Sequence, residues 1–189
     1  KSGSVRSEDL QAKEMACLSV ELMSCIARVG DIDSAYKAPE LLTKYLHDLA
    51  ALMRFFGSDI AVCEILLCFF RDYAESFIAT LNKENSAVLF QSCADLLKEY
   101  SYHQIQHRSV AKKSSAEVDA KEEQAYNDIL CAIQLLINLG TKDFVDACGS
   151  SDRIGTDQVA GVLFFGLQQI LPLMTQGLLE YPSLCVQFF

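Results

Sequence analysis

The sequence predicts an all-α protein. Apolar residues recur every three to four positions through six full segments, and no segment of convincing length alternates apolar and polar residues as a strand would. Only three prolines and nine glycines interrupt the 189 residues, of which 51% are hydrophobic. Because no sheet is available for the helices to cover, we expect them to pack on one another.

The first three segments have boundaries typical of helices. We expect a helix at 8–29 behind Ser7 as N-cap, a second at 39–56, and a third at 59–81. Pro39 suits the first turn of the second helix, where its missing N–H is no loss. The third helix is apolar over most of its circumference, which predicts burial between neighbours. The apolar stripe of the first helix consists of Met15, Leu18, Leu22, Cys25, Ile26 and Val29.

The middle of the chain predicts two further helices, at 86–100 and 121–139, each with an apolar stripe in register. Residues 101–120 separate them. This stretch is rich in histidine, lysine and serine and continues no apolar stripe, so we expect a polar connecting loop there.

The last part predicts an irregular stretch at 141–155, a sixth helix at 156–175 and a seventh that begins at Pro182. Pro172 should kink or end the sixth helix. The chain opens without a methionine and stops within an apolar run at 188–189. We therefore expect a piece of a longer protein, because natural termini are usually polar.

Pairing the helices predicts repeated units. The units fall at about 39–81, 86–139 and 156–189, and the helix at 8–29 closes an earlier one. The first two begin about 47 residues apart, within the period of two-helix HEAT or armadillo units. We therefore expect residues 1–189 to form one HEAT/armadillo-like α-α superhelix, with stacked antiparallel helix pairs.

The net charge of −9 argues against nucleic acid as a partner, because an acidic chain repels phosphates. It would suit a basic protein, although acidic surfaces mostly serve solubility. We expect no membrane insertion. The longest apolar run, Val159 to Met174, contains Gln168, Gln169 and Pro172 and is too short to span a bilayer.

The eight cysteines form no C-x-x-C pair, and most of them fall within apolar stripes. This pattern indicates small buried side chains in a reducing compartment, the cytosol or nucleus, and predicts eight free thiols. The cysteines are Cys17, Cys25, Cys63, Cys68, Cys93, Cys131, Cys148 and Cys185.

No pattern of residues indicates catalysis, a cofactor or a metal. His103 and His107 have the i, i+4 spacing of zinc ligands but lack third and fourth ligands, so solvated loop histidines are the better interpretation. Cys63 and Cys68 lie on different faces of one helix, without a nearby histidine to activate either thiol. Phosphate-binding glycine motifs are absent from the sequence.

One candidate for partner binding is an acidic loop. Asp143, Asp146 and Asp152 fall within the expected irregular stretch and could contact a basic protein. Merely solvated carboxylates are the alternative. For the remainder of a helical stack, we expect contacts through solvent-facing residues of the more buried helix in each unit.

The C-terminal run Gly166-LQQILPLMTQGLLEYPSLCVQF-Phe189 resembles the exportin-4 type of nuclear export receptor in the importin-β superfamily. Two further stretches resemble the same type, Glu122-EQAYNDI-Leu130 and Leu135-LINLGTKDFV-Asp146. The resemblance extends from about residue 86 to residue 189. It implies late repeats of a receptor that shuttles between nucleus and cytoplasm.

The resemblance also implies partners. Receptors of this kind carry folded cargo proteins, bind the GTPase Ran in its GTP form mainly through repeats nearer the N-terminus, and contact Phe-Gly repeats of nucleoporins on their outer face. None of this is enzymatic. Two alternatives stay open. One is a HEAT scaffold in another intracellular pathway, such as a kinase or phosphatase regulator, and the other is an all-α enzyme or lipid carrier, which would need a closed pocket.

Overall fold

The computed structural model describes residues 2–28, 37–111, 126–149, 156–174, 178 and 186. Within these residues every regular element is helical, which confirms the all-α prediction. The elements are α1 (Ser2–Arg28), α2 (Lys37–Thr43), α3 (Leu46–Phe56), α4 (Ile60–Phe77), α5 (Lys83–Ala111), α6 (Asn127–Gly149), α7 (Thr156–Ile170) and the 3-10 turn η2 (Leu171–Leu173).

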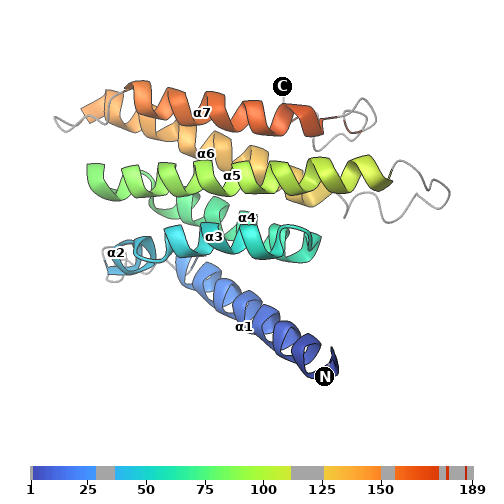
Figure 1. The fold of residues 1–189 in the computed structure, drawn as a ribbon. Helices are drawn as coiled ribbons and strands as arrows, with labels where there is room; N and C mark the ends of the chain where they lie inside the picture. Colours follow the sequence, from blue (N-terminus) through green and yellow to red (C-terminus); the bar gives the residue numbers. More distant parts are fainter. Residues whose placement is uncertain are drawn as a thin grey trace.

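The helices form two layers (Figure 1). In one layer α4 lies between α1 and α6, and in the other α5 lies between α3 and α7. The layers meet through α3 with α4 and through α6 with α7. No helix in the part of the chain that the structure describes has both the length and the apolar character needed to cross a bilayer.

Neighbouring helices within a layer run parallel. In the layer of α1 and α4, Lys13 pairs with Asp59 at one end and Arg28 pairs with Asp72 at the other. From the first ion pair to the second, the residue numbers of α1 and of α4 both increase, so the two helices are parallel. Figure 1 shows the same common direction for α3, α5 and α7.

Contacts along the second layer agree with that direction. Arg54 of α3 pairs with Glu99 of α5 at 3.2 Å, and Ser101 of α5 donates a hydrogen bond of 2.8 Å to the carbonyl of Gln169. Between the layers the direction reverses. Gly140 of α6 faces Leu163 of α7, whereas Leu136 faces Gly166.

The core lies between the two layers and is rich in aromatic residues. Its largest fully buried side chains are Tyr73, Tyr100, Phe69, Phe70 and Phe90. A buried hydroxyl needs a hydrogen-bond partner, and both tyrosines have one. Tyr100 donates to Asp128 Oδ2 at 2.7 Å, and the Tyr73 hydroxyl lies 2.6 Å from Thr43 Oγ1.

Two of the expected loops are partly helical, so those predictions were wrong. Helix α5 continues through residues 101–111, because Ser101 and Gln104 are buried and occupy the stripe that Leu97 begins. Helix α6 continues through residues 141–149, which contain no proline to stop it. Extending a formed helix costs far less than nucleating one, so weakly apolar sequence is sufficient.

The buried face of α1 also differs from the prediction. The expected stripe is largely exposed, with exposed fractions of 65% for Met15, 60% for Leu18 and 64% for Leu22. Val20 and Ala27 are buried in its place. Helix α1 packs on α4, and the buried residues of α1 are Val20, Ser24 and Ala27 rather than the larger apolar ones.

Helix α1 begins at Ser2, so the prediction that Ser7 is the N-cap of a helix starting at residue 8 was wrong. The remaining boundaries are closer to the prediction. The expected helix at 39–56 is two helices, α2 and α3, separated by a turn at residues 44–45. Helix α7 ends at Ile170 and a 3-10 turn containing Pro172 follows, which confirms the expected effect of that proline. Most of the seventh helix, expected at 182–189, lies outside the described residues.

Candidate functional site

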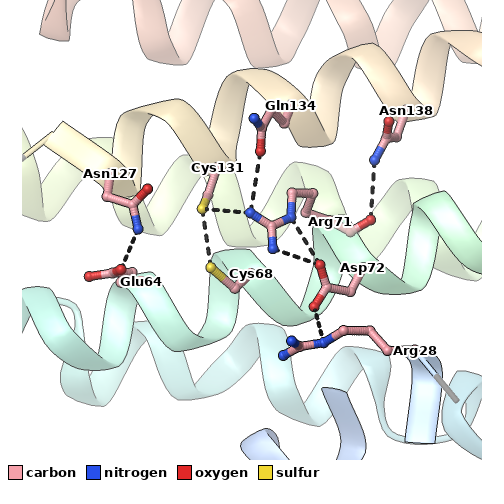
Figure 2. A network of polar contacts seen from close by, with 9 residues as sticks. All are labelled: Arg28, Glu64, Cys68, Arg71, Asp72, Asn127, Cys131, Gln134 and Asn138. Atoms are coloured by element: carbon pink, nitrogen blue, oxygen red, sulfur yellow. Dashed lines mark hydrogen bonds and ion pairs between the residues drawn. The ribbon is translucent and has the colours of Figure 1, made fainter. Parts of the chain in front are cut away.

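Polar residues gather on one face of α4, the middle helix of its layer. Glu64, Cys68, Arg71 and Asp72 have the spacing i, i+4, i+7 and i+8, which places them along one side of the helix. Figure 2 shows them between α1 and α6. The layer of α3, α5 and α7 covers the opposite side of this layer. Members of the network differ in exposure, since Asp72 and Cys131 are buried whereas Arg28 is exposed.

The contacts of α4 with α6 follow one register. Glu64 accepts a hydrogen bond from Asn127, and the thiols of Cys68 and Cys131 meet one helical turn later. The next turn brings Arg71 to Gln134. All three pairs are separated by 63 residues in the sequence. A constant offset means that α4 and α6 lie parallel and in register along this face.

The centre of the network is the buried carboxylate of Asp72, whose side chain is 5% exposed. Arg71 donates to its Oδ1 atom from Nε at 2.9 Å and from Nη2 at 2.7 Å. Arg28 of α1 lies 2.9 Å from Oδ2, through Nε, as an ion pair rather than an aligned hydrogen bond. Such a carboxylate is tolerated inside a protein only when cations compensate it.

The guanidinium of Arg71 also reaches α6. Its Nη1 atom lies 3.3 Å from both Cys131 Sγ and Gln134 Oε1, and Asn138 Nδ2 donates to its backbone carbonyl at 3.3 Å. One arginine of α4 therefore connects to the carboxylate next to it and to three residues of α6. The guanidinium makes its contacts with Asp72, Cys131 and Gln134 at once through a planar fork of donors, which a lysine could not reproduce. The contact with Asn138 uses the backbone carbonyl instead.

The two thiols form an unequal pair. Their sulfur atoms are 3.1 Å apart. The hydrogen bond from Cys131, assisted by the charge of Arg71, lowers the pKa of Cys68, although partial burial opposes this. That same hydrogen bond and burial raise the pKa of Cys131. Of the two thiols, Cys68 is therefore the one that ionises more easily.

Two open grooves flank this network. The groove between α1 and α4 is lined by Glu21, Ser24, Arg28, Ala61, Glu64, Ile65 and Cys68. The groove between α4 and α6 is lined by Arg71, Glu75, Gln134, Ile137 and Asn138. Both are open and mixed in polarity, which suits contact with a protein surface better than capture of a small molecule.

The acidic residues singled out from the sequence have a setting different from the expected one. Asp143 and Asp146 lie on helix α6, so the prediction that they belong to a loop was wrong. Their side chains and all of Asp152 lie outside the described residues. The role of the three carboxylates in partner binding stays a prediction.

The histidine pair also has a different setting from the expected one. His103 and His107 lie on α5 rather than in a loop. The ring of His103 is half-buried against Gly57 and lies 5.5 Å from the ring of Tyr102, whereas the side chain of His107 is outside the described residues. Within the described ranges, no group of three or more histidine, cysteine or acidic side chains could hold a metal ion.

Sequence reasoning missed the contact between Cys68 and Cys131. The two cysteines are 63 residues apart, so no local motif connects them. Only the register between α4 and α6 brings them together, and that register depends on how the helices stack. The sequence alone holds no signal for that register. A comparison with protein-family models finds no match for this chain.

Proposed function

We propose that this chain is a scaffold segment of a nuclear export receptor of the importin-β superfamily, in which stacked HEAT-type helix pairs bind folded protein partners. The layered arrangement of parallel helices is the observation that carries this proposal. Helices α1, α4 and α6 run one way in the first layer, and α3, α5 and α7 run one way in the second. Repetition of one helix pair generates such an arrangement.

The layer of α1, α4 and α6 supplies the surface on which we place a protein partner. Its two open grooves lie side by side along α4 and expose charges of both signs, among them Glu21, Arg28 and Glu75. Protein surfaces of mixed charge favour partners of complementary charge. Under this proposal the partner is a cargo protein, and Ran in its GTP form binds mainly elsewhere.

The layer of α3, α5 and α7 is the proposed contact for nucleoporin Phe-Gly repeats. It exposes separate large apolar side chains on all three helices: Phe55 is 77% exposed, Tyr102 60% and Phe164 74%. Shallow apolar positions of this kind can each hold one phenylalanine of a repeat, and several weak contacts together give useful affinity.

The proposal is tested by binding of the 189-residue chain to an immobilised Phe-Gly repeat peptide, with a Ser-Gly repeat peptide as control. We expect binding to the first alone, weakened several-fold by Phe55→Ser together with Phe164→Ser. Ile137→Ser, on the other layer, should leave it unchanged. Equal retention on both peptides would overturn the nuclear-transport proposal and favour a scaffold of another pathway.

A second experiment concerns Ran. In a longer receptor that contains this chain, GTP-loaded Ran should bind and GDP-loaded Ran should not. Equal binding of both forms, or of neither, would also contradict the proposal. The choice of nucleotide is decisive because a general helical scaffold has no reason to distinguish the two forms of the GTPase.

A further inference from the structure

Cys68 and Cys131 have an arrangement that the scaffold function does not require. Among the described cysteines, no other pair of sulfur atoms lies within hydrogen-bond distance. Cys63 donates to the carbonyl of Gly57 at 3.4 Å, Cys93 is fully buried, and Cys25 is exposed. The pair is thus a distinct feature of the face between α4 and α6 (Figure 2).

We propose that Cys68 and Cys131 form an oxidisable dithiol, which a peroxide converts to a disulfide that joins α4 to α6 covalently. A disulfide bond is about 2.05 Å long, and the sulfur atoms are already 3.1 Å apart. Closing the bond therefore needs an approach of about 1 Å, which rotation of two side chains and a slight shift of parallel helices can supply.

The surroundings assign different roles to the two sulfurs. Cys68 lines the open groove between α1 and α4, so a small oxidant can reach it, whereas Cys131 is buried behind it. Arg71 Nη1 lies 3.3 Å from Cys131 Sγ and places positive charge beside the pair. A thiolate is the nucleophile toward peroxides, and the hydrogen bond from Cys131 stabilises that form of Cys68.

The chemistry balances in two steps with hydrogen peroxide as oxidant. The Cys68 thiolate attacks one peroxide oxygen, an S–O bond forms, the O–O bond breaks, and hydroxide leaves with the electron pair. The Cys131 sulfur then attacks Cys68 Sγ, the S–S bond forms, and the S–O bond breaks. The proton of Cys131 and one from solvent convert both hydroxide groups to water. Two thiols and one peroxide give one disulfide and two waters.

The disulfide would change the polar network between α4 and α6 as well as link the two helices. In the reduced protein Arg71 contacts Cys131, Gln134 and Asp72 together. Formation of the disulfide removes both S–H groups, and with them the hydrogen bond between the two thiols beside that guanidinium. Both open grooves border this arginine or Cys68, so oxidation alters a surface available to a protein partner.

The test treats the folded 189-residue chain with hydrogen peroxide, blocks remaining thiols, and identifies cross-linked peptides by mass spectrometry without reduction. We expect a Cys68–Cys131 disulfide as the first intramolecular product, reversed by a dithiol reductant. Cys131→Ser should stop at a sulfenic acid on Cys68, trapped by dimedone, and Cys68→Ser should give neither product. Cys93→Ser is the matched control, because it removes a buried thiol without a sulfur partner.

An independent probe is phenylarsine oxide, whose arsenic binds two thiols at once. The reduced chain should bind one equivalent, which either Cys68→Ser or Cys131→Ser abolishes and Cys93→Ser does not. Circular dichroism confirms that each variant is folded. A wild-type chain that oxidises at exposed Cys25 and still forms no Cys68–Cys131 bond, or that binds no arsenical, would overturn the proposal. Both outcomes are independent of binding to Phe-Gly repeats.

Discussion

Arg28 of α1 lies 2.9 Å from the buried carboxylate of Asp72 on α4, and Arg71 holds the other oxygen of the same carboxylate. The two arginines differ in setting. The Arg28 side chain is 61% exposed, whereas that of Arg71 is 25% exposed and makes further contacts with α6. Asp72 thus links α4 to α1 through Arg28, and Arg71 extends the network from Asp72 to α6.

Removing Arg71 and removing Arg28 should lower the free energy of unfolding by different amounts. We expect Arg71→Met to lower the free energy of unfolding by about 3 kcal/mol, because it leaves a buried charge with one exposed partner. Arg28→Met should cost about 1 kcal/mol or less, as for other exposed ion pairs. Urea unfolding followed by circular dichroism measures both. Arg54→Met, which removes an exposed pair with Glu99, is the control. Equal costs for Arg71 and Arg28 would contradict the central role of Arg71.

Asp59 should make stability depend on pH in the acid range. Partial burial would raise the pKa of its carboxyl, but hydrogen bonds from Lys13 and the backbone of Val62 outweigh this and hold that pKa below 3.8. A lowered pKa in the folded state means that the contribution is fully present well above pH 3.8. It is lost as the pH falls through the folded pKa.

Asp59 is the N-cap of α4, where its side chain accepts from the backbone N–H of Val62. The variant Asp59→Asn isolates the charge, since asparagine caps a helix about as well as aspartate. We expect the variant to be less stable than wild type at pH 7, and the difference to shrink as the pH falls below 3.8. Measuring unfolding free energies in urea at several pH values checks this. If the difference in unfolding free energy between wild type and Asp59→Asn grew in acid, the pH dependence would have the opposite sign and the interpretation would be wrong.

The hydrogen bond from Tyr100 to Asp128 gives a third prediction. Both residues are buried, and the bond joins α5 to α6 at 2.7 Å. Tyr100→Phe should lower the free energy of unfolding by about 2 kcal/mol, because a carboxylate loses a buried donor. Tyr102→Phe is a matched control on an exposed position and should change stability by no more than about 0.5 kcal/mol. Thermal unfolding of both variants measures the two changes in stability and shows whether the buried hydrogen bond accounts for the difference.

A substitution at Gly57, with one at Gly161 of α7 as the comparison, tests the packing between the end of α3 and α5. A Cβ at Gly57 would collide with the ring of His103 and with the carbonyl oxygen of Met53, whereas one at Gly161 meets nothing within 4 Å. Gly57→Ala should therefore destabilise the chain by about 2 kcal/mol through overpacking. Gly161→Ala, in helix α7, should stabilise it by up to about 1 kcal/mol, because alanine favours the helix. Stabilisation by both substitutions would mean that His103 moves away freely.

The sequence predicted the type of every long element but not every end or face. Periodicity located α3, α4 and α7 well because their stripes are apolar and face the core. It failed at 101–111, because Ser101 and Gln104 are polar and yet buried, so hydrophobicity could not reveal that α5 continues. It also failed for α1, where small residues such as Ala27 face α4 and larger apolar ones remain exposed.

The candidate site was less predictable for a physical reason. Each member of the network is an ordinary residue of its own helix, and Cys68 was interpreted as a small buried side chain. Its contact with a second thiol arises from the parallel register of α4 and α6, which places Cys131 opposite it. That register arises from side-chain packing along two whole helices, which no local pattern encodes.

The final prediction concerns the stability of the oxidised chain. A bond between Cys68 and Cys131 closes a long loop in the unfolded state, which reduces its conformational entropy. For a loop of this length the chain-entropy relation gives an upper value of about 4 kcal/mol in favour of the folded state. We therefore expect peroxide treatment to raise Tm, and a dithiol reductant to restore the original value. Cys68→Ser should show no change with either reagent, while Cys93→Ser should behave as wild type. A disulfide identified by mass spectrometry together with a lowered Tm would mean that bond closure strains the packing of α4 on α6. The dithiol would then be oxidisable without acting as a stabilising link.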